Sequence, residues 1–495
     1  MQKVKARDTM VETRGTLRRR RSVSSSSSAG ARDDEAEDEP LIATDDKSRG
    51  ISGIKIKENN KANEDAKNEG CCRSPRRTYH VAKWVILRLL GMVYFVAFLG
   101  AYNQNVALMG EDGLVPASPY MSRMRSNYDS NLDAFRSHPT LFWWIPLTDT
   151  NLDGFAIAGL ILSFLLTVGI DSWLILVMLW LLDFSIVTVA ETNSFYSYGW
   201  ESQLLETGFL AIFLCDLPSI RKIRRGNYNE SHWKWEISAI WRDDRSDGRA
   251  TNGSADRAIN NAPSTTALWL LRWLCFRISM GAGLIKIRGG SCWEERTCLY
   301  YHFETQPIPS PLSFFFHFLP KSMLKHAVDL DLFVQLYSSW MVLIPGLIGV
   351  VGGYIQAAFM INIILSGNFA FLNHLTIIPS LASIEDAYWP RWLSSRILRA
   401  TTIPSKAREE SKAVQQVAAA IRRLIDTILL ILVGYLSIPV IANLLQWGGS
   451  HQQMNAGFNS FRLVNTCELF ICPCSIVAFV FIRSVLIFIC LCLSL

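Results

Sequence analysis

The sequence predicts an all-α polytopic membrane protein, a helical bundle of about seven to nine membrane helices that follows a disordered N-terminal tail. Half of the 495 residues are hydrophobic, and they gather in runs long enough to cross a bilayer. Only 19% are charged, and Lys and Arg collect in short segments between those runs. Cytosolic loops of membrane proteins have this bias, so the net charge of +6 needs no nucleic-acid partner.

Residues 1–79 are expected to form a disordered cytosolic tail. They contain a basic run, Arg18 to Arg21, a serine run, Ser24 to Ser28, and an acidic cluster, Asp33 to Glu39. Such a segment buries too little apolar surface to offset the entropy lost on ordering. No apolar core follows the first ten residues, so the first apolar helix is expected to serve as an internal signal anchor.

Residues 80–446 are expected to form the multi-pass membrane domain. The first helix is predicted over Val81 to Tyr102, and the basic residues before it place its start in the cytosol. A luminal loop with little helix is predicted over about 103–152. Two close helices follow at Gly154 to Ile170 and Trp173 to Ala190, and a short apolar helix then ends near Leu217.

A basic cytosolic loop is predicted over 219–263, and its two glycosylation sequons, at Asn229 and Asn252, should therefore be unused. The next helix, Ala267 to Ile287, leads into a second luminal loop at about 288–332. The apolar stretch 334–384 is broken by Gly and Pro and is expected to cross the membrane three times.

The C-terminal part begins with another basic segment, 391–423, expected in the cytosol, and a last crossing over Leu424 to Leu445. Residues 447–475 are predicted to start a luminal C-terminal region. The apolar tail 476–495 is long enough to span a bilayer.

Cys292 and Cys298 flank Trp293 in the second luminal loop. In an oxidising lumen the two cysteines would pair as a small clip at the base of the loop. Two alternatives stay open. A metal could take Cys292, Cys298 and His302, although this is not a standard zinc spacing, or the thiols could be unpaired or exchange with client proteins.

Three charged residues fall inside apolar runs, where a charge is costly and is usually paired. At about 1.5 Å per residue, Glu206 lies about 7 Å from the luminal edge, Asp183 about 10 Å and Arg277 about 15 Å. An Arg side chain spans that offset, so Arg277 is predicted to pair with Asp183 or Glu206. Such a pair would join helices, and a substrate or proton site is the alternative interpretation.

His302 and Glu304 could form an acid/base pair, but a loop histidine beside an acid is more often a surface hydrogen bond. No hydrolase, zinc-protease, Walker or Rossmann motif stands in a fitting context. We therefore assign no catalytic residue, no metal and no cofactor from the sequence.

The stretch Met280 to Pro309 is similar to the pattern of the lipase maturation factor family of the endoplasmic reticulum. That pattern reads GAGLIK-RG, a Cys-Trp pair, a second Cys and then a His-aromatic-Glu-Thr-Gln-Pro segment. The residues that match it are Gly281, Gly283, Lys286, Arg288, Gly289, Cys292, Trp293, Cys298, His302, Glu304, Thr305, Gln306 and Pro307. Further matches run in order from about Gly91 to Thr466 and include Trp200-Glu201, Leu204 to Leu210, and Phe458 to Phe461.

The resemblance implies a multi-pass protein of the endoplasmic reticulum membrane that helps secreted lipases fold and assemble into active dimers. Its partners would be lipase clients and membrane lipid, with homo-oligomerisation left open. Trp293, Tyr300, Tyr301 and Phe303 are the candidates for client contact. After Thr466 this chain departs from the family, which continues into a luminal domain.

Two other functions compete with the folding-factor interpretation. The family is distantly similar in membrane architecture to the vitamin K-dependent carboxylases, so a membrane-embedded enzyme, carboxylase-like or lipid-modifying, is one alternative. Its polar groups would be Glu206, Arg277 and His302. A transporter would need a polar line through the bilayer and an inverted repeat, and neither is evident in the sequence.

Overall fold

The described part of the chain is built from helices alone, which confirms the predicted all-α class. The computed structural model describes residues 77–191, 195–196, 199–215, 263–289, 291–306, 309–367, 370–401 and 412–445. The predicted tail (apart from residues 77–79), both sequons and the regions 447–475 and 476–495 lie outside these ranges. The helices are α2 (His80–Met109), α3 (Ala117–Arg125), α4 (Asn131–Ser137), η1 (Leu141–Trp143), α5 (Asp149–Val168), α6 (Trp173–Glu191), α7 (Gly199–Ile212), α10 (Thr265–Gly289), α11 (Ser291–Glu294), α12 (Leu299–His302), α13 (Ser313–His317), α14 (Lys321–Phe333), η3 (Val334–Ser338), α15 (Ser339–Met341), α16 (Leu347–Ser366), α17 (Leu372–Ser380), η4 (Leu381–Ser383), η5 (Asp386–Tyr388), α18 (Arg391–Thr401) and α19 (Lys412–Leu445).

Five of these helices are long and apolar enough to cross a membrane, namely α2, α5, α6, α10 and α16. A span needs about 20 mostly apolar residues. The predicted count of seven to nine also includes α7 and α17, which have 14 and 9 residues, and α19. At about 1.5 Å per residue, α7 and α17 are shorter than a bilayer core of about 30 Å. The larger count therefore stays a prediction.

The segment 103–152 was wrongly predicted to contain little helix. The helix α2 continues seven residues past Tyr102 and ends at Met109, and the N–H of its C-cap residue Gly110 donates to Val106 O. After it, α3, α4 and η1 form a small helical cap, in which Trp143 is only 1% exposed and donates from Nε1 to His138 O at 2.7 Å. Tertiary packing, and not a bilayer interface, therefore holds this tryptophan.

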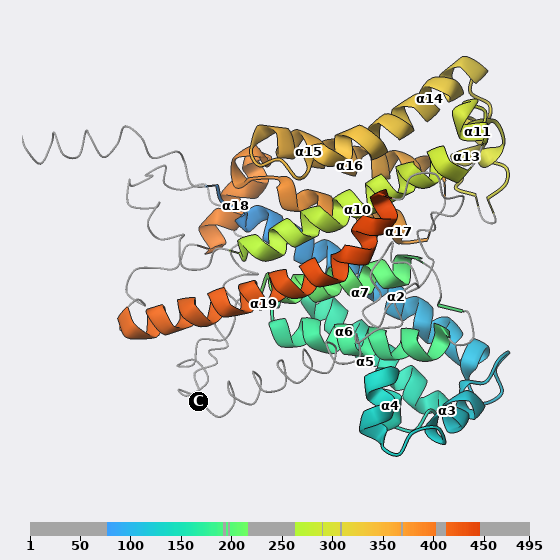
Figure 1. Cartoon of the computed structure of the whole chain (residues 1–495), viewed down its shortest axis with the longest axis vertical. Coiled ribbons are helices and arrows are strands. Elements are labelled where there is room, and N and C mark those ends of the chain that lie inside the picture. The colour runs from blue at the N-terminus through green and yellow to red at the C-terminus, as the bar shows by residue number, and fades with distance from the viewer. Residues whose placement is uncertain are drawn as a thin grey trace, which may run out of the picture. The chain divides into compact units, whose positions relative to one another are not determined.

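Between α10 and α18 the chain reverses direction three times (Figure 1). The continuous helical segment α14–η3–α15 runs back along α10 and α16, then α16 runs forward, and α17 runs back beside it. The turn before α16 is made by Gly346, whose φ of 88° suits glycine. The stretch 334–384 thus contains three antiparallel segments, the first of which starts earlier, at Lys321, and of these only α16 is long enough to span a membrane, so the three expected crossings stay a prediction.

The π turn η3 explains one glycine of the GAGLIK stretch. A side chain at Gly283 would place its Cβ 2.6 Å from Leu336 Cδ2, so glycine lets α10 and η3 pack closely without displacing Leu336. A π turn also disturbs the helical hydrogen-bond ladder. Gln356 Nε2 donates to Val334 O at 2.9 Å, and its Oε1 accepts from Ser279 Oγ at 2.8 Å. This network joins α10, η3 and α16.

We predict that Gly283→Val lowers the midpoint of thermal unfolding of the detergent-solubilised chain, since overpacking a close helix contact costs about 1–3 kcal/mol. The control is Gly154→Val, because nothing lies within 4 Å of a Cβ at that exposed position. Equal midpoints for the two variants would show that the α10–η3 contact does not require glycine.

Candidate functional site

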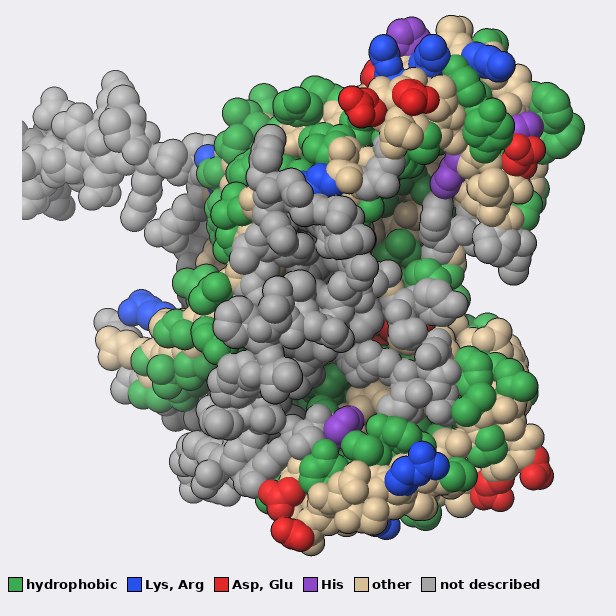
Figure 2. Space-filling model, turned by 45° about the vertical axis from the view of Figure 1, so that its right-hand side comes forward, with side chains coloured by type: hydrophobic (Ala, Val, Ile, Leu, Met, Phe, Trp, Pro, Cys, Tyr) green, Lys and Arg blue, Asp and Glu red, His purple; other side chains and the backbone are tan. Residues whose placement is uncertain are grey.

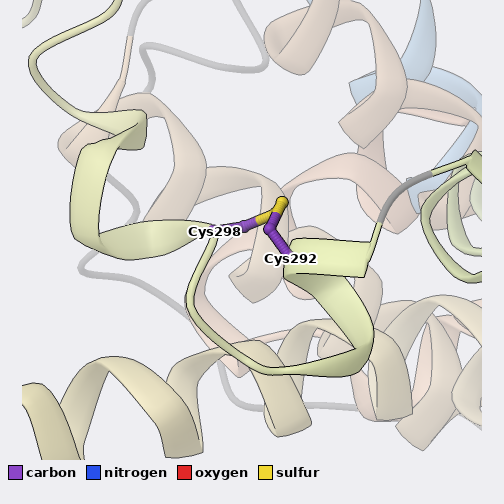
Figure 3. The surroundings of a disulfide bond; sticks show 2 residues. All are labelled: Cys292 and Cys298. Carbon is purple, nitrogen blue, oxygen red and sulfur yellow. A yellow bond between two sulfur atoms is a disulfide. The ribbon is translucent and has the colours of Figure 1, made fainter.

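The segment predicted as the second luminal loop is a compact fold held by a disulfide between Cys292 and Cys298 (Figure 3). Cys292 lies in α11 and Cys298 directly precedes α12, with their Cα atoms 4.8 Å apart. The Cys292 carbonyl accepts hydrogen bonds from Thr297 N–H at 2.8 Å and Cys298 N–H at 3.2 Å. Between them, Arg296 turns the chain with a φ of 58°. The disulfide and these backbone bonds close one tight turn between Cys292 and Cys298. We call the segment that contains this turn, residues 291–306, the cysteine loop.

Lys286, in the last turn of α10, ties the cysteine loop to the helix that precedes it. Its Nζ lies 2.5 Å from Asp331 Oδ2 on α14 and 4.5 Å from the ring centre of Trp293. A second pair, Arg296 with Asp329 at 3.3 Å, also joins the loop to α14. One lysine thus contacts a carboxylate and an aromatic ring from two other elements, and this arrangement fixes where the loop leaves the bundle.

The four client-contact candidates differ in how much of their side chain reaches the surface. Tyr301 is 63% exposed. Trp293 and Tyr300 are half-buried, and each ring faces a lysine, Lys286 and Lys321 respectively. Phe303 is only 6% exposed, so its ring supports the loop from inside and is not presented to a partner.

His302 and Glu304 do not form the acid/base pair considered from the sequence. Glu304 Oε2 lies 3.7 Å from His317 Nε2, on α13, while His302 Nε2 lies 3.1 Å from Gln306 Nε2. Burial, and then the positive charge of Lys286, lower the pKa of His302, and burial raises the pKa of Asp331. The site thus favours a neutral imidazole.

The metal alternative would need the sulfur atoms of Cys292 and Cys298, which are bonded to each other. Within the described ranges, no group of three or more His, Cys, Asp or Glu side chains is arranged to hold a metal ion. The geometry of the loop is therefore that of a disulfide clip.

Below the loop, Arg277 of α10 pairs with Glu206 of α7 inside the bundle. Their side chains are 0% and 4% exposed, so the pair is removed from water. Asp183 of α6 is buried as well, but the carboxylate that pairs with Arg277 is that of Glu206.

The short helix α7 is anchored by side chains from two other helices. Leu205 O accepts from Trp180 Nε1 at 3.0 Å, and Gln203 Nε2 donates to Thr376 Oγ1 at 2.9 Å. On the other side, Gly208 lies directly under the Tyr94 hydroxyl, where a Cβ would clash. These contacts explain why the stretch from Trp200 to Leu210 mixes polar and small residues within an apolar helix.

Sequence reasoning missed the pair between Lys286 and Asp331. Both charges lie within one turn of the end of an apolar stretch, and this shared position could have indicated the pair from the sequence. It also made no prediction for three exposed phenylalanines on and beside α13, Phe314, Phe315 and Phe318.

We predict that Arg277→Leu leaves membrane insertion intact but reduces the yield of folded protein. Removing one partner of a buried ion pair leaves the other charge uncompensated, at a cost of about 3–5 kcal/mol. The readouts are carbonate extraction for insertion and size-exclusion chromatography in detergent for folded yield.

The matched control is Arg296→Leu, whose pair with Asp329 is half exposed, with side-chain exposures of 51% and 45%. A pair of that kind contributes about 0–1 kcal/mol, so its loss should change little. The double variant Arg277→Leu/Glu206→Leu should recover part of the yield. A normal yield for Arg277→Leu alone would contradict a stabilising role.

We predict that the cysteine loop opens more easily as the pH falls. The pKa of His302 is lower in the folded loop than its ordinary 6.5, so the unfolded loop binds more protons near that pH. The contribution of His302 to the stability of the folded loop is full above about pH 6.5, and it is lost as the pH drops toward the folded-state pKa.

The measurement is the rate of protease cleavage within the loop, for the native and His302→Asn chains, from about pH 7.5 to about pH 5.5. The ratio of the two rates at each pH cancels the protease's own pH dependence. A ratio that stays constant across this range would rule out His302 as the titrating group.

The chain matches the family model described as the lipase maturation factor transmembrane domain over residues 81–391. Lipase maturation factor 1 of Bos taurus is 37% identical over 405 residues, which cover 79% of this chain and 65% of that protein. Lipase maturation factor 1 of Mus musculus is 36% identical over 409 residues, with 79% and 63% covered. Lipase maturation factor 2 of Xenopus laevis is 28% identical over 318 residues, with 63% and 40% covered.

No solved structure matches the chain. The chain spans about 63–65% of the length of the two lipase maturation factor 1 relatives. The matched region 81–391 contains α2 to α17, and with them both the cysteine loop and the buried ion pair. The chain therefore belongs to the lipase maturation factor family.

Proposed function

We propose that this chain is a folding factor of the endoplasmic reticulum membrane that assists secreted lipases to fold and assemble into active dimers. The observation that carries the proposal is the match of residues 81–391 to the family's transmembrane domain, in a chain with five helices suited to crossing a membrane. The disulfide of the cysteine loop suits an oxidising compartment such as the endoplasmic reticulum lumen.

In the proposed mechanism, the cysteine loop shields the apolar surface of an immature lipase until the client dimerises. The disulfide and the two backbone bonds at Cys292 O pre-organise the loop, so little ordering entropy is lost on contact. Tyr301 is the main candidate contact because its ring is largely exposed, and Trp293 and Tyr300 border it. Aromatic side chains of this kind dominate the binding energy of many protein interfaces.

The buried Arg277–Glu206 pair has a structural role in this proposal. It joins α10, the helix that ends at the cysteine loop, to α7 within the bundle. The enzyme alternative gains no support from the described contacts, since Glu206 is paired with Arg277 and Glu304 faces His317. We expect no nucleic-acid partner, and homo-oligomerisation remains a separate question for the purified chain.

The test uses cells that lack their own lipase maturation factor and express one secreted lipase. This chain and a full-length relative are supplied side by side, and two quantities are measured: secreted lipase activity, and immature lipase that co-purifies with the factor. We expect this chain to co-purify with immature lipase, and Tyr301→Ala to reduce that amount by about fivefold or more, the loss of one aromatic hot spot.

Trp144→Ala is the matched control, since Trp144 is 53% exposed but lies in the first luminal loop. A chain that is folded and membrane-inserted, yet neither binds immature lipase nor raises secreted activity, would refute the proposed function. Secretion that depends on His302 while client binding is unchanged would instead favour an enzyme.

A further inference from the structure

Three phenylalanines around α13 form an exposed patch at the end of the cysteine loop. Phe314, Phe315 and Phe318 are 64%, 66% and 67% exposed. Phe314 contacts both of the others, with ring centres 5.7 Å from Phe315 and 4.7 Å from Phe318. We call these three residues the phenylalanine patch. Leaving several large apolar side chains in water forfeits about 1.5–3 kcal/mol each, so such a cluster indicates a surface that is covered in the working protein.

The opposite side of α13 is already occupied by the protein. Phe316 packs on Phe303 of the cysteine loop, with ring centres 5.9 Å apart, and His317 faces Glu304. Ser313 is buried and donates from Oγ to Ser366 O at 2.8 Å. Residues 313, 316 and 317 therefore face inward, while 314, 315 and 318 face away from the protein, as expected for two sides of one helical turn.

The contacts of α13 place it where α16 ends. Ser310 Oγ donates to Leu365 O at 3.2 Å, and Ser313 Oγ donates to Ser366 O. These carbonyls belong to the last turn of α16, whose C=O groups have no partner within the helix. Because α16 is long and apolar enough to span a bilayer, its last turn marks the height at which the chain leaves the membrane.

The phenylalanine patch adjoins the end of α16, whose outward side is apolar. On α16, Ile361 and Leu365 are 49% and 44% exposed. Side chains of spanning helices that face outward from the bundle contact lipid. Figure 2 shows hydrophobic side chains at the upper left and upper right of the molecule, with a group of charged side chains at its top.

We propose that the phenylalanine patch inserts into the bilayer leaflet next to the end of α16 and so holds the cysteine loop at the membrane surface. Lipid is what covers the patch, because the patch adjoins the outward-facing side of α16 and contains no charged residue. Phenylalanine is typical of the apolar face that interfacial segments bury at the headgroup–acyl boundary, and a short segment is enough to fix a loop that is already attached to spanning helices. Through the Phe303–Phe316 contact, the patch sets the height of the Tyr301 surface above the membrane.

The test is site-specific photo-crosslinking of the full chain in sealed microsomes from cells that express no secreted lipase. A benzophenone amino acid replaces Phe315, and separately Phe318, and an alkyne-tagged phospholipid supplied to the cells reports lipid adducts. Ile361, on the exposed face of α16, is the positive control, and Tyr301, equally exposed but in α12, is the matched control.

We expect Phe315 and Phe318 to give lipid adducts at the level of Ile361 and about tenfold above Tyr301, in keeping with the transfer of an aromatic ring from water to lipid. Lipid adducts at the Tyr301 level, or adducts to luminal proteins in their place, would overturn the proposal. Since no lipase is present, neither result bears on the folding-factor function, which is measured separately by co-purification and secretion.

Discussion

The fold of the cysteine loop depends on one charge in the last turn of α10. The ammonium group of Lys286 contacts the Asp331 carboxylate of α14 and the Trp293 ring of α11. An unpaired ammonium group at this depth would be costly, so the end of α10, the start of the cysteine loop and α14 are held together. The disulfide then only has to close a short turn, because the start of the cysteine loop is already held in place.

Another cation of α10 is paired with a carboxylate deeper in the bundle. Arg277 lies about two and a half turns before Lys286 on α10, and it pairs with Glu206 from α7. Farther out, Arg288 Nη2 donates to Leu444 O at 3.0 Å and joins α10 to the end of α19. Arg277, Lys286 and Arg288 therefore each contact a different neighbour, so α10 links the spanning helices to the cysteine loop.

The two surfaces that we assign to partners are different in kind. Tyr301 projects from a loop stiffened by a disulfide and by backbone bonds, which suits contact with a folding protein. The phenylalanine patch lies against the end of a spanning helix, which suits lipid. The two are linked by the buried Phe303, so the ring that we first considered for client contact instead connects them.

The sequence by itself determined the helical membrane class, the approximate spans and the segment around Cys292, because apolar runs, basic flanks and motif spacing are local properties of the chain. Only the tertiary structure decided which carboxylate meets Arg277, that Lys286 reaches Asp331, and that Phe303 is buried while Phe315 is exposed. Those outcomes depend on which helix faces are brought together. The π turn at Val334, the three helical segments of the first luminal loop and the early start of α14 are likewise set by packing against distant residues.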